Sequence, residues 1–368
     1  MKVLVTGANG FIGKNICQRL LQSEQHSVLK FCRDTDLAEL PNLVAEADAV
    51  IHLAGENRPD EEEAFDLVNR GVTERLCDIL MQLGHPKPIL FASSTHAERD
   101  SAYGKSKKAA EEVLFELAEN LDIQLSVFRL PGVFGKWCRP NYNSVVATFC
   151  HNIANALPIQ VDAPNAMLSL VYIDDVVDAF LAAICDSSER GIYRTVEPVY
   201  EISLGDLAQR IHNYAQIRSH LTVPGVGVGL DRALYSTFVS YLPVEKFSYH
   251  IPVYGDERGV FAEMLKTTGS GQFSFFTAKP GITRGEHYHH TKTEKFLVVS
   301  GQARFGFRQI VTNQKVFLEV SGEAPTVVET IPGWAHDITN IGKTDMIVML
   351  WANEVFDRDR PDTFACKV

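Results

Sequence analysis

The N-terminal segment constrains the fold most strongly, because it joins the three parts of a nucleotide-binding unit without a break. Lys2–Thr6 is an apolar strand, Gly7, Gly10 and Gly13 form a glycine turn, and an amphipathic helix follows directly. Glycines let the backbone approach a ligand, and the N-terminus of a helix offers unpaired N–H groups to phosphates. The segment therefore predicts a pyrophosphate site in an α/β domain, with an ordinary tight turn as the alternative.

The spacing Gly-x2-Gly-x2-Gly resembles that of the extended short-chain dehydrogenase/reductases. The resemblance implies a Rossmann-type domain that binds NAD(P) at the carboxyl ends of its strands. The implied cofactor contacts are Gly7, Gly10, Phe11, Ile12, Gly13, Leu53, Ala54, Gly55, Tyr103, Lys107, Arg129 and Pro131. Arg33 ends the second strand where a carboxylate would bind the 2′-hydroxyl of NAD, so we expect NADPH, with a surface arginine as the alternative.

A tyrosine and a lysine follow an apolar strand that ends in hydroxyl-bearing residues. Tyr103 and Lys107 share one face of a helix, and we expect the ammonium to lower the pKa of the phenol. Such a hydroxyl can exchange a proton near neutral pH. With Ser94, this set resembles the Ser…Tyr-x3-Lys triad of the same superfamily, and Ser93 and Thr95 are alternative hydroxyl groups.

The sequence pattern changes near residue 247, where helical periodicity gives way to short strands separated by Gly, Pro and Asp. The predicted strands are Val260–Leu265, Phe273–Ala278, Glu294–Val299, Ala303–Ile310, Lys315–Val320, Thr326–Thr330 and Met346–Trp351. A chain of 368 residues is long enough for two domains. We therefore predict an α/β domain over 1–246 and an all-β domain over 247–368.

Three histidines and a glutamate in this second half have the spacing of a metal site. His287 and His289 alternate along the chain, Glu294 follows, and His336 comes after the next strands. Imidazoles with a carboxylate bind Zn²⁺ or a similar divalent ion. The motifs Gly-x5-His-x-His-x4-Glu-x6-Gly and Gly-x2-His-x3-Asn resemble those of the cupin barrel. The second cupin motif usually reads Pro-x-Gly, whereas Pro332 here directly precedes Gly333. We expect His290 to face outward.

The segment Arg284-Gly-Glu-His287 also resembles that of the sugar-nucleotide 3,5-epimerases, a cupin-like family. This resemblance implies that His287 removes a proton beside a keto group and that Lys295 helps to hold the enolate. One imidazole nitrogen cannot bind a metal and accept a proton at once. Three interpretations stay open: a metal centre, a metal-independent base, and an inert dimerisation module with buried histidines.

Composition excludes several other classes of protein. A net charge of −11 argues against nucleic acid as the main partner. No apolar run reaches the roughly 18 residues that a membrane span needs, and the N-terminus does not resemble a signal peptide. The seven cysteines are scattered without a Cys-x-x-Cys pair, which is typical of reduced thiols in a cytoplasmic protein.

The chain carries a reductase motif set followed by a cupin motif set. Over its whole length it resembles the bifunctional capsular polysaccharide enzymes of the CapF type. The resemblance implies that a UDP-linked 4-keto-6-deoxy-N-acetylhexosamine is epimerised at C3 in the barrel. NADPH-dependent reduction at C4 would then give UDP-2-acetamido-2,6-dideoxy-L-talose, a precursor of UDP-N-acetyl-L-fucosamine for capsule or O-antigen. Lys136 or Arg139 is available for the diphosphate.

Two further classes of function remain. The chain could be a reductase whose barrel is purely structural, or a non-catalytic NADP-binding sensor. The Tyr103/Lys107 pair argues against the sensor, which has no need of it. We expect a homodimer, because both folds often dimerise.

Overall fold

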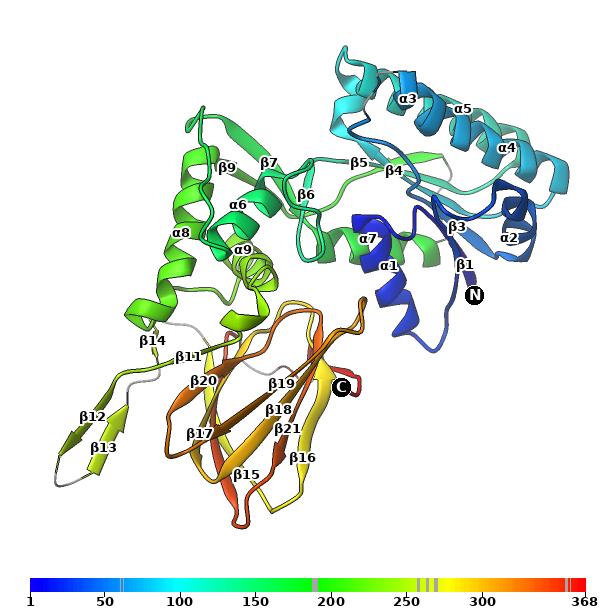
Figure 1. Cartoon of the computed structure of the whole chain (residues 1–368). Coiled ribbons are helices and arrows are strands. Elements are labelled where there is room, and N and C mark those ends of the chain that lie inside the picture. The colour runs from blue at the N-terminus through cyan, green and yellow to red at the C-terminus, as the bar shows by residue number, and fades with distance from the viewer. Residues whose placement is uncertain are drawn as a thin grey trace. The chain divides into compact units, whose positions relative to one another are not determined.

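The computed structural model describes residues 1–59, 61, 63–186, 191–256, 259–262, 265–267, 271–354, 357 and 359–368 (Figure 1). The chain divides into two compact units, of which the first is Met1–Ser144 with Met167–Ile202 and the second is Val145–Ala166 with Ser203–Val368. The change from helices to strands falls near residue 247, as predicted. However, the helical segments 145–166 and 203–246, which we assigned to the first domain, belong to the second compact unit. The domain boundary at 246/247 stays a prediction.

The first unit is built on a six-stranded parallel sheet with the strand order β2-β1-β3-β4-β5-β8. Its strands are β1 (Lys2–Thr6), β2 (Ser27–Phe31), β3 (Ala49–His52), β4 (Ile89–Ser94), β5 (Leu125–Leu130) and β8 (Ile192–Arg194). In this order β2 pairs with one edge of β1 and β3 pairs with its other edge, so the strand order reverses at β1. The carboxyl end of β1 is therefore a topological switch point, where ligands of open α/β sheets bind.

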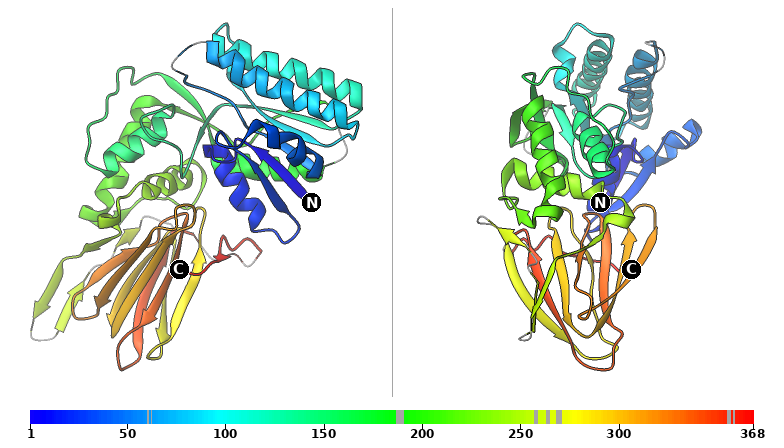
Figure 2. Two further views of the ribbon diagram at one scale, coloured as in Figure 1. Left: turned by 45° about the vertical axis from the view of Figure 1, so that its right-hand side comes forward. Right: turned by 60° about the vertical axis from the view of Figure 1, so that its left-hand side comes forward.

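Helices cover both faces of this sheet (Figures 1 and 2). They are α1 (Phe11–Leu21), α2 (Leu40–Glu46), α3 (Glu63–Phe65), α4 (Gly71–Leu83), α5 (Ala102–Leu121) and α7 (Ile173–Cys185). Helices α4 and α5 pack side by side on one face, and α1 packs against α7 on the other. Leu4, Val50 and Phe91 of the sheet meet Leu76 and Leu114 of the helices in a core from which water is excluded. A small sheet adds β6 (Gly132–Phe134), β7 (Met167–Tyr172) and β9 (Val199–Ser203).

The second unit combines three helices with two five-stranded sheets that face each other (Figure 2). The helices are α6 (Val145–Ala154), α8 (Leu204–His220) and α9 (Gly229–Ser240). One sheet is β11 (Ser248–His250), β20 (Thr326–Glu329), β17 (Glu294–Ser300), β22 (Met346–Ala352) and β15 (Gln272–Ala278). The other is β19 (Lys315–Ser321), β18 (Gln302–Gln309), β21 (Trp334–Asn340), β16 (Thr283–Tyr288) and β23 (Phe364–Ala365). The predicted fold class, a Rossmann-type α/β part followed by an all-β cupin-like barrel, is confirmed.

Two short ribbons complete the described strands. They are β12 (Val253–Asp256) with β13 (Gly259–Ala262), and β10 (Thr222–Val223) with β14 (Lys266–Thr267). Across the residues that the structure describes, none of the helices has the length and apolarity needed to cross a bilayer.

Candidate functional site

The glycine turn after β1 leaves space that only glycine can provide. Gly7 has a φ of +66°, and a Cβ on it would lie 2.9 Å from the backbone nitrogen of Ala54. A Cβ on Gly13 would lie 2.3 Å from the carbonyl oxygen of Gly7. The N-terminus of α1 at Gly10 receives no side-chain cap. The turn and the open helix end thus fit a pyrophosphate group at the switch point of the sheet.

The other predicted cofactor contacts of this region surround the same edge. Phe11 and Ile12 begin α1, while Leu53, Ala54 and Gly55 directly follow β3. The N–H groups of Leu53 and Ala54 each donate to the hydroxyl of Thr6, at 3.1 Å. These two bonds hold the chain after β3 beside the glycine turn. Pro131 follows β5, farther along the sheet.

The structure brings the predicted catalytic triad together at the carboxyl end of β4. The Ser94 hydroxyl hydrogen-bonds the Tyr103 phenol, which lies in the first turn of α5. The Lys107 ammonium donates to the carbonyl of Ala92 at 3.0 Å, and a Cβ on Gly55 would lie 3.2 Å from it. Tyrosine, serine and lysine thus lie beside the cofactor edge.

The alternative serine has another partner. The hydroxyl of Ser93 donates to the carboxylate of Glu111 and is buried. Ser94 is half-buried, and its oxygen also accepts the N–H of His96 at 3.1 Å. These contacts favour Ser94 as the serine of the triad.

Burial determines the protonation of both titratable groups of the triad. It raises the pKa of Tyr103, partly offset by the hydrogen bond from Ser94. It lowers the pKa of Lys107 to about 8. Our prediction that Lys107 lowers the pKa of Tyr103 is therefore wrong for this structure, in which Ser94 has that effect. At neutral pH the phenol is protonated and can donate a proton.

Two aromatic rings beside Tyr103 escaped the sequence analysis. The Phe65 ring lies 5.6 Å from the tyrosine ring, and the His96 ring lies 6.0 Å from it, edge-on. Phe65 precedes a π-helical turn, Asp66–Arg70, a feature often found at functional sites. Neither ring has a motif of its own, so only the folded chain places them next to the phenol.

Arg33 lies just beyond β2, and its side chain is 87% exposed. Its guanidinium pairs with the carboxylate of Glu56 at 2.7 Å. Burial would raise the pKa of Glu56, but hydrogen bonds from Tyr142 and the N–H groups of Arg58 and Asn57 lower it. The carboxylate is thus ionised, and it holds Arg33 close to the chain that follows β3.

Two predicted anion-binding residues form ion pairs with carboxylates of the protein itself. Arg129 binds Glu111 through three hydrogen bonds and Glu98 through another at 2.8 Å, so its predicted contact with the cofactor is not supported. Lys136 is buried and pairs with Asp174 at 2.8 Å, which makes a diphosphate contact unfavourable. Both cations instead balance buried carboxylates of helices, Glu111 of α5 and Asp174 of α7. These ion pairs were not foreseen because sequence does not reveal which carboxylate faces each cation.

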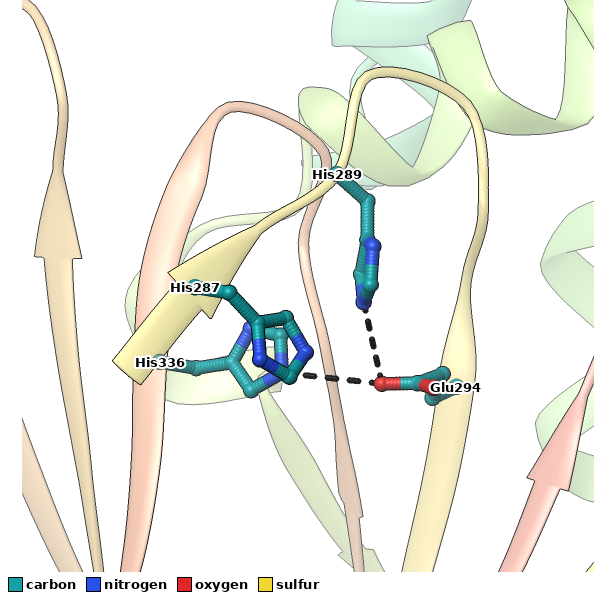
Figure 3. A group of neighbouring side chains, drawn as sticks. All are labelled: His287, His289, Glu294 and His336. Carbon is teal, nitrogen blue, oxygen red and sulfur yellow. Dashed lines mark hydrogen bonds and ion pairs between the residues drawn. The ribbon is translucent and has the colours of Figure 1, made fainter. Parts of the chain in front are cut away.

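The four predicted metal-binding residues meet in the barrel (Figure 3). His287 and His336 lie opposite each other on β16 and β21, with a bulge in β16 directly before His287. His289 follows β16, and Glu294 begins β17 in the facing sheet. One ligand atom from each residue lies within 4.8 Å of the others. The prediction of their proximity is confirmed.

The donor set fits a cation. His289 Nδ1 lies 2.6 Å from the carbonyl oxygen of Asp362, which only accepts hydrogen bonds, so Nδ1 carries the hydrogen. This bond leaves Nε2 as the nitrogen directed at a carboxylate oxygen of Glu294, 3.1 Å away. His336 Nε2 lies 3.5 Å from the same oxygen and makes no hydrogen bond. Imidazole nitrogens gathered around a carboxylate in a buried site are the donor set that a divalent cation binds.

The ionisation states in the barrel are those of metal ligands. Burial lowers the pKa of His287 to about 4, and His336 and His289 add to the effect. Burial also lowers the pKa of His336. Burial would raise the pKa of Glu294, but the neighbouring histidines keep it well below its usual value. Neutral imidazoles and an ionised carboxylate bind a divalent cation without first losing protons.

The structure does not support the predicted role of Lys295 and contradicts the predicted orientation of His290. Lys295 follows Glu294 on β17 and therefore faces the opposite side of the strand, where it pairs with the buried carboxylate of Glu329. It does not reach the histidines. His290 is buried and not turned outward, since its ring packs against Tyr288 and Phe364.

Comparisons with known proteins agree with both parts of this architecture. Residues 3–196 match the model of the NAD dependent epimerase/dehydratase family, which covers more than half of the chain. The chain belongs to this family. Residues 254–364 of this family member match the polysaccharide biosynthesis C-terminal domain.

Two full-length relatives share both parts. UDP-2-acetamido-2,6-beta-L-arabino-hexul-4-ose reductase from Pseudomonas aeruginosa is 53% identical and covers 100% of this chain and 99% of its own. The crystal structure of the capsular polysaccharide assembling protein CapF from Staphylococcus aureus is 41% identical, covers 100% of both chains and has a TM-score of 0.69. The chain is thus of the CapF type. A crystal structure of UDP-glucuronic acid 4-epimerase from Bacillus cereus shares the fold over 58% of this chain and 83% of its own. It is 21% identical, with a TM-score of 0.52.

Proposed function

We propose that the chain reduces a UDP-linked 4-keto-6-deoxy-N-acetylhexosamine with NADPH. The observation that carries this proposal is the Ser94–Tyr103–Lys107 set beside a glycine turn that fits pyrophosphate. The substrate class is supported by the reductase from Pseudomonas aeruginosa, whose name specifies a UDP-linked hexul-4-ose. The exposed Arg33 at the end of β2 supports NADPH over NADH.

The chain's own groups have distinct roles in the reduction. Tyr103 donates the proton to the C4 oxygen, because burial keeps its phenol protonated. Ser94 hydrogen-bonds the same oxygen, and the Lys107 ammonium, which is protonated below about pH 8, holds the ribose and stabilises the phenolate that forms. The bound cofactor supplies the hydride. The exposed Arg139, which stacks on Tyr142, is the cation for the diphosphate.

For the barrel we propose C3 epimerisation of the same sugar before its reduction. His287, His289, Glu294 and His336 would hold a divalent cation, with Zn²⁺ our first choice for this donor set. Such a cation supplies polarisation of the keto oxygen and so lowers the cost of the enolate. His287 is the least buried of the four, so it is also the best placed to take the C3 proton if it does not bind the metal.

The order of the two steps follows from carbonyl chemistry. Only a proton next to the carbonyl is acidic enough to exchange, and reduction to the alcohol removes the carbonyl. Epimerisation must therefore come first. The product would be UDP-2-acetamido-2,6-dideoxy-L-talose, a precursor for capsule or O-antigen. A reductase with a purely structural barrel is the second candidate, favoured if the buried histidines bind no metal.

Deuterium exchange separates these candidates. The enzyme and the 4-keto substrate are incubated in D₂O with and without NADPH, and the sugar is analysed for deuterium at C3. We expect deuterium at C3 without NADPH, and none under any condition would remove the epimerase step. Tyr103→Phe should abolish NADPH oxidation but leave exchange unchanged, since the phenol serves only the reduction. Loss of both activities in this folded variant would contradict the two-site proposal.

A further inference from the structure

One residue from the C-terminal segment organises the loop that carries the metal-binding histidines. The carboxylate of Asp362 accepts the N–H of His290 at 3.0 Å, of Thr291 at 2.8 Å and of Lys292 at 2.7 Å. It also accepts the Thr291 hydroxyl at 3.0 Å. Three successive backbone donors on one carboxylate fix the course of the loop between β16 and β17.

The backbone of the same residue orients a histidine. The carbonyl of Asp362 accepts the Nδ1 hydrogen of His289 at 2.6 Å, which leaves Nε2 as the atom directed at Glu294. Asp362 has a φ of +38°, in the left-handed region that few residues other than glycine, asparagine and aspartate adopt readily. In this conformation its carbonyl and carboxylate both contact the loop.

The next residue reaches the carboxylate ligand. The hydroxyl of Thr363 accepts a hydrogen bond from the ammonium of Lys292 at 3.1 Å, and this ammonium lies 3.8 Å from Oε1 of Glu294. The other oxygen of Glu294 faces His289 and His336. The C-terminal segment thus contacts the surroundings of the site through both its aspartate and its threonine.

We propose that Asp362 is a positioning residue of the histidine site, which sets the tautomer of His289 and the course of the ligand loop. The proposal rests on the metal-binding part of the proposed function. Asp362 does not touch the reacting atoms. It acts through His289 and through the backbone of residues 290–292, so its effect is on cation affinity. Groups that orient metal ligands in this way change affinity by about 10- to 100-fold when mutated.

The test measures Zn²⁺ binding to the full-length apoprotein by competition with a chromogenic chelator. Asp362→Asn retains tolerance of the left-handed backbone but replaces one acceptor oxygen with a donor. We expect Zn²⁺ to bind this variant about 10- to 100-fold more weakly. The d–d absorption of bound Co²⁺ should also change, which a loss of stability alone would not produce. Asp359→Asn, an exposed acid of the same segment, is the control and should bind as the wild type does.

The outcomes distinguish this proposal from the one on which it rests. Equal Zn²⁺ affinity of Asp362→Asn and wild type overturns the role of Asp362 and leaves the metal site intact. Absence of Zn²⁺ binding to the wild type overturns the metal site itself. If Asp362→Asn does not fold, Asp362→Glu, which keeps the charge but moves the carboxylate, carries the same expectation and the same refutation.

Discussion

Two roles are possible for Lys295, one in catalysis and one in the stability of the barrel, and a single variant distinguishes them. Resemblance to the 3,5-epimerases gives it a role in holding an enolate, whereas the structure buries it against Glu329 on the side of β17 that faces away from Glu294. Glu329 also pairs with Arg218 of α8. We predict that Lys295→Met destabilises the protein and leaves deuterium exchange at C3 intact.

The expected losses of unfolding free energy follow from the remaining partners. Lys295→Met leaves Glu329 paired with Arg218, so the loss should be about 1.5–3 kcal/mol, the range for a hydrogen bond to a charged group. Glu329→Gln leaves the ammonium, whose side chain is 2% exposed, without a countercharge, and should cost about 3–5 kcal/mol. The double variant should lose less than the sum, because the second substitution removes the charge that the first left unpaired.

The assay is chemical denaturation followed by tryptophan fluorescence, in which Trp334 and Trp351 report on the barrel. Lys315→Met, at an exposed position of β19, is the matched control and should change stability by less than about 0.5 kcal/mol. Exchange at C3 is measured in parallel at a temperature where each variant is folded. A Lys295→Met variant of unchanged stability that no longer exchanges deuterium would refute our reasoning and return the residue to the active site.

Three further predictions concern the reduction site. Reduction should decline above about pH 8 as Lys107 loses its proton, because burial lowers its pKa to about 8, and a pH profile of kcat/KM that stays flat to pH 9.5 would contradict this. The free energy of unfolding should rise between about pH 8 and 10.5, because in this range the Lys107 amine is protonated in the unfolded chain, with a pKa of 10.5, but not in the folded chain. Lys107→Met should remove this rise in urea titrations. Arg33→Ala should raise KM for NADPH about 10-fold and leave KM for NADH unchanged, since only the 2′-phosphate needs the guanidinium; equal changes would exclude that contact.

The sequence analysis was most accurate for elements whose geometry depends only on residues that are neighbours in the chain. Strand, glycine turn and helix follow one another directly, so their geometry is local, and β1 and α1 form as expected. The strand predicted over Glu294–Val299 is observed as Glu294–Ser300, and that over Lys315–Val320 as Lys315–Ser321. By contrast, Trp334–Asn340 was read only as a histidine motif, because its alternation is interrupted by apolar residues that are buried on both sides of β21.

Site residues were predicted less well when their role depends on a distant partner. Arg129 was read as a cofactor contact because sequence places it at the end of β5, and only the fold brings Glu111 and Glu98 to its guanidinium. Asp362 lies far along the chain from His289 and forms no motif with it. Lys295 is the most instructive case, because strand alternation alone already places it on the face of β17 opposite to Glu294. We gave the resemblance in spacing more weight than the rule that successive side chains of a strand point to opposite faces of the sheet.

Burial accounts for how both sites are ready at the same pH. Desolvation disfavours the charged form of any group, so it raises the pKa of the Tyr103 phenol and lowers that of the His287 and His336 imidazoles. The first shift keeps a proton available for the donation that we propose at C4. The second keeps imidazole nitrogens available for a cation or, in the proposed epimerisation, for the C3 proton. One physical effect, acting on an acid in one unit and on bases in the other, would therefore prepare proton donation and proton removal together near neutral pH, as the two proposed steps on one sugar require.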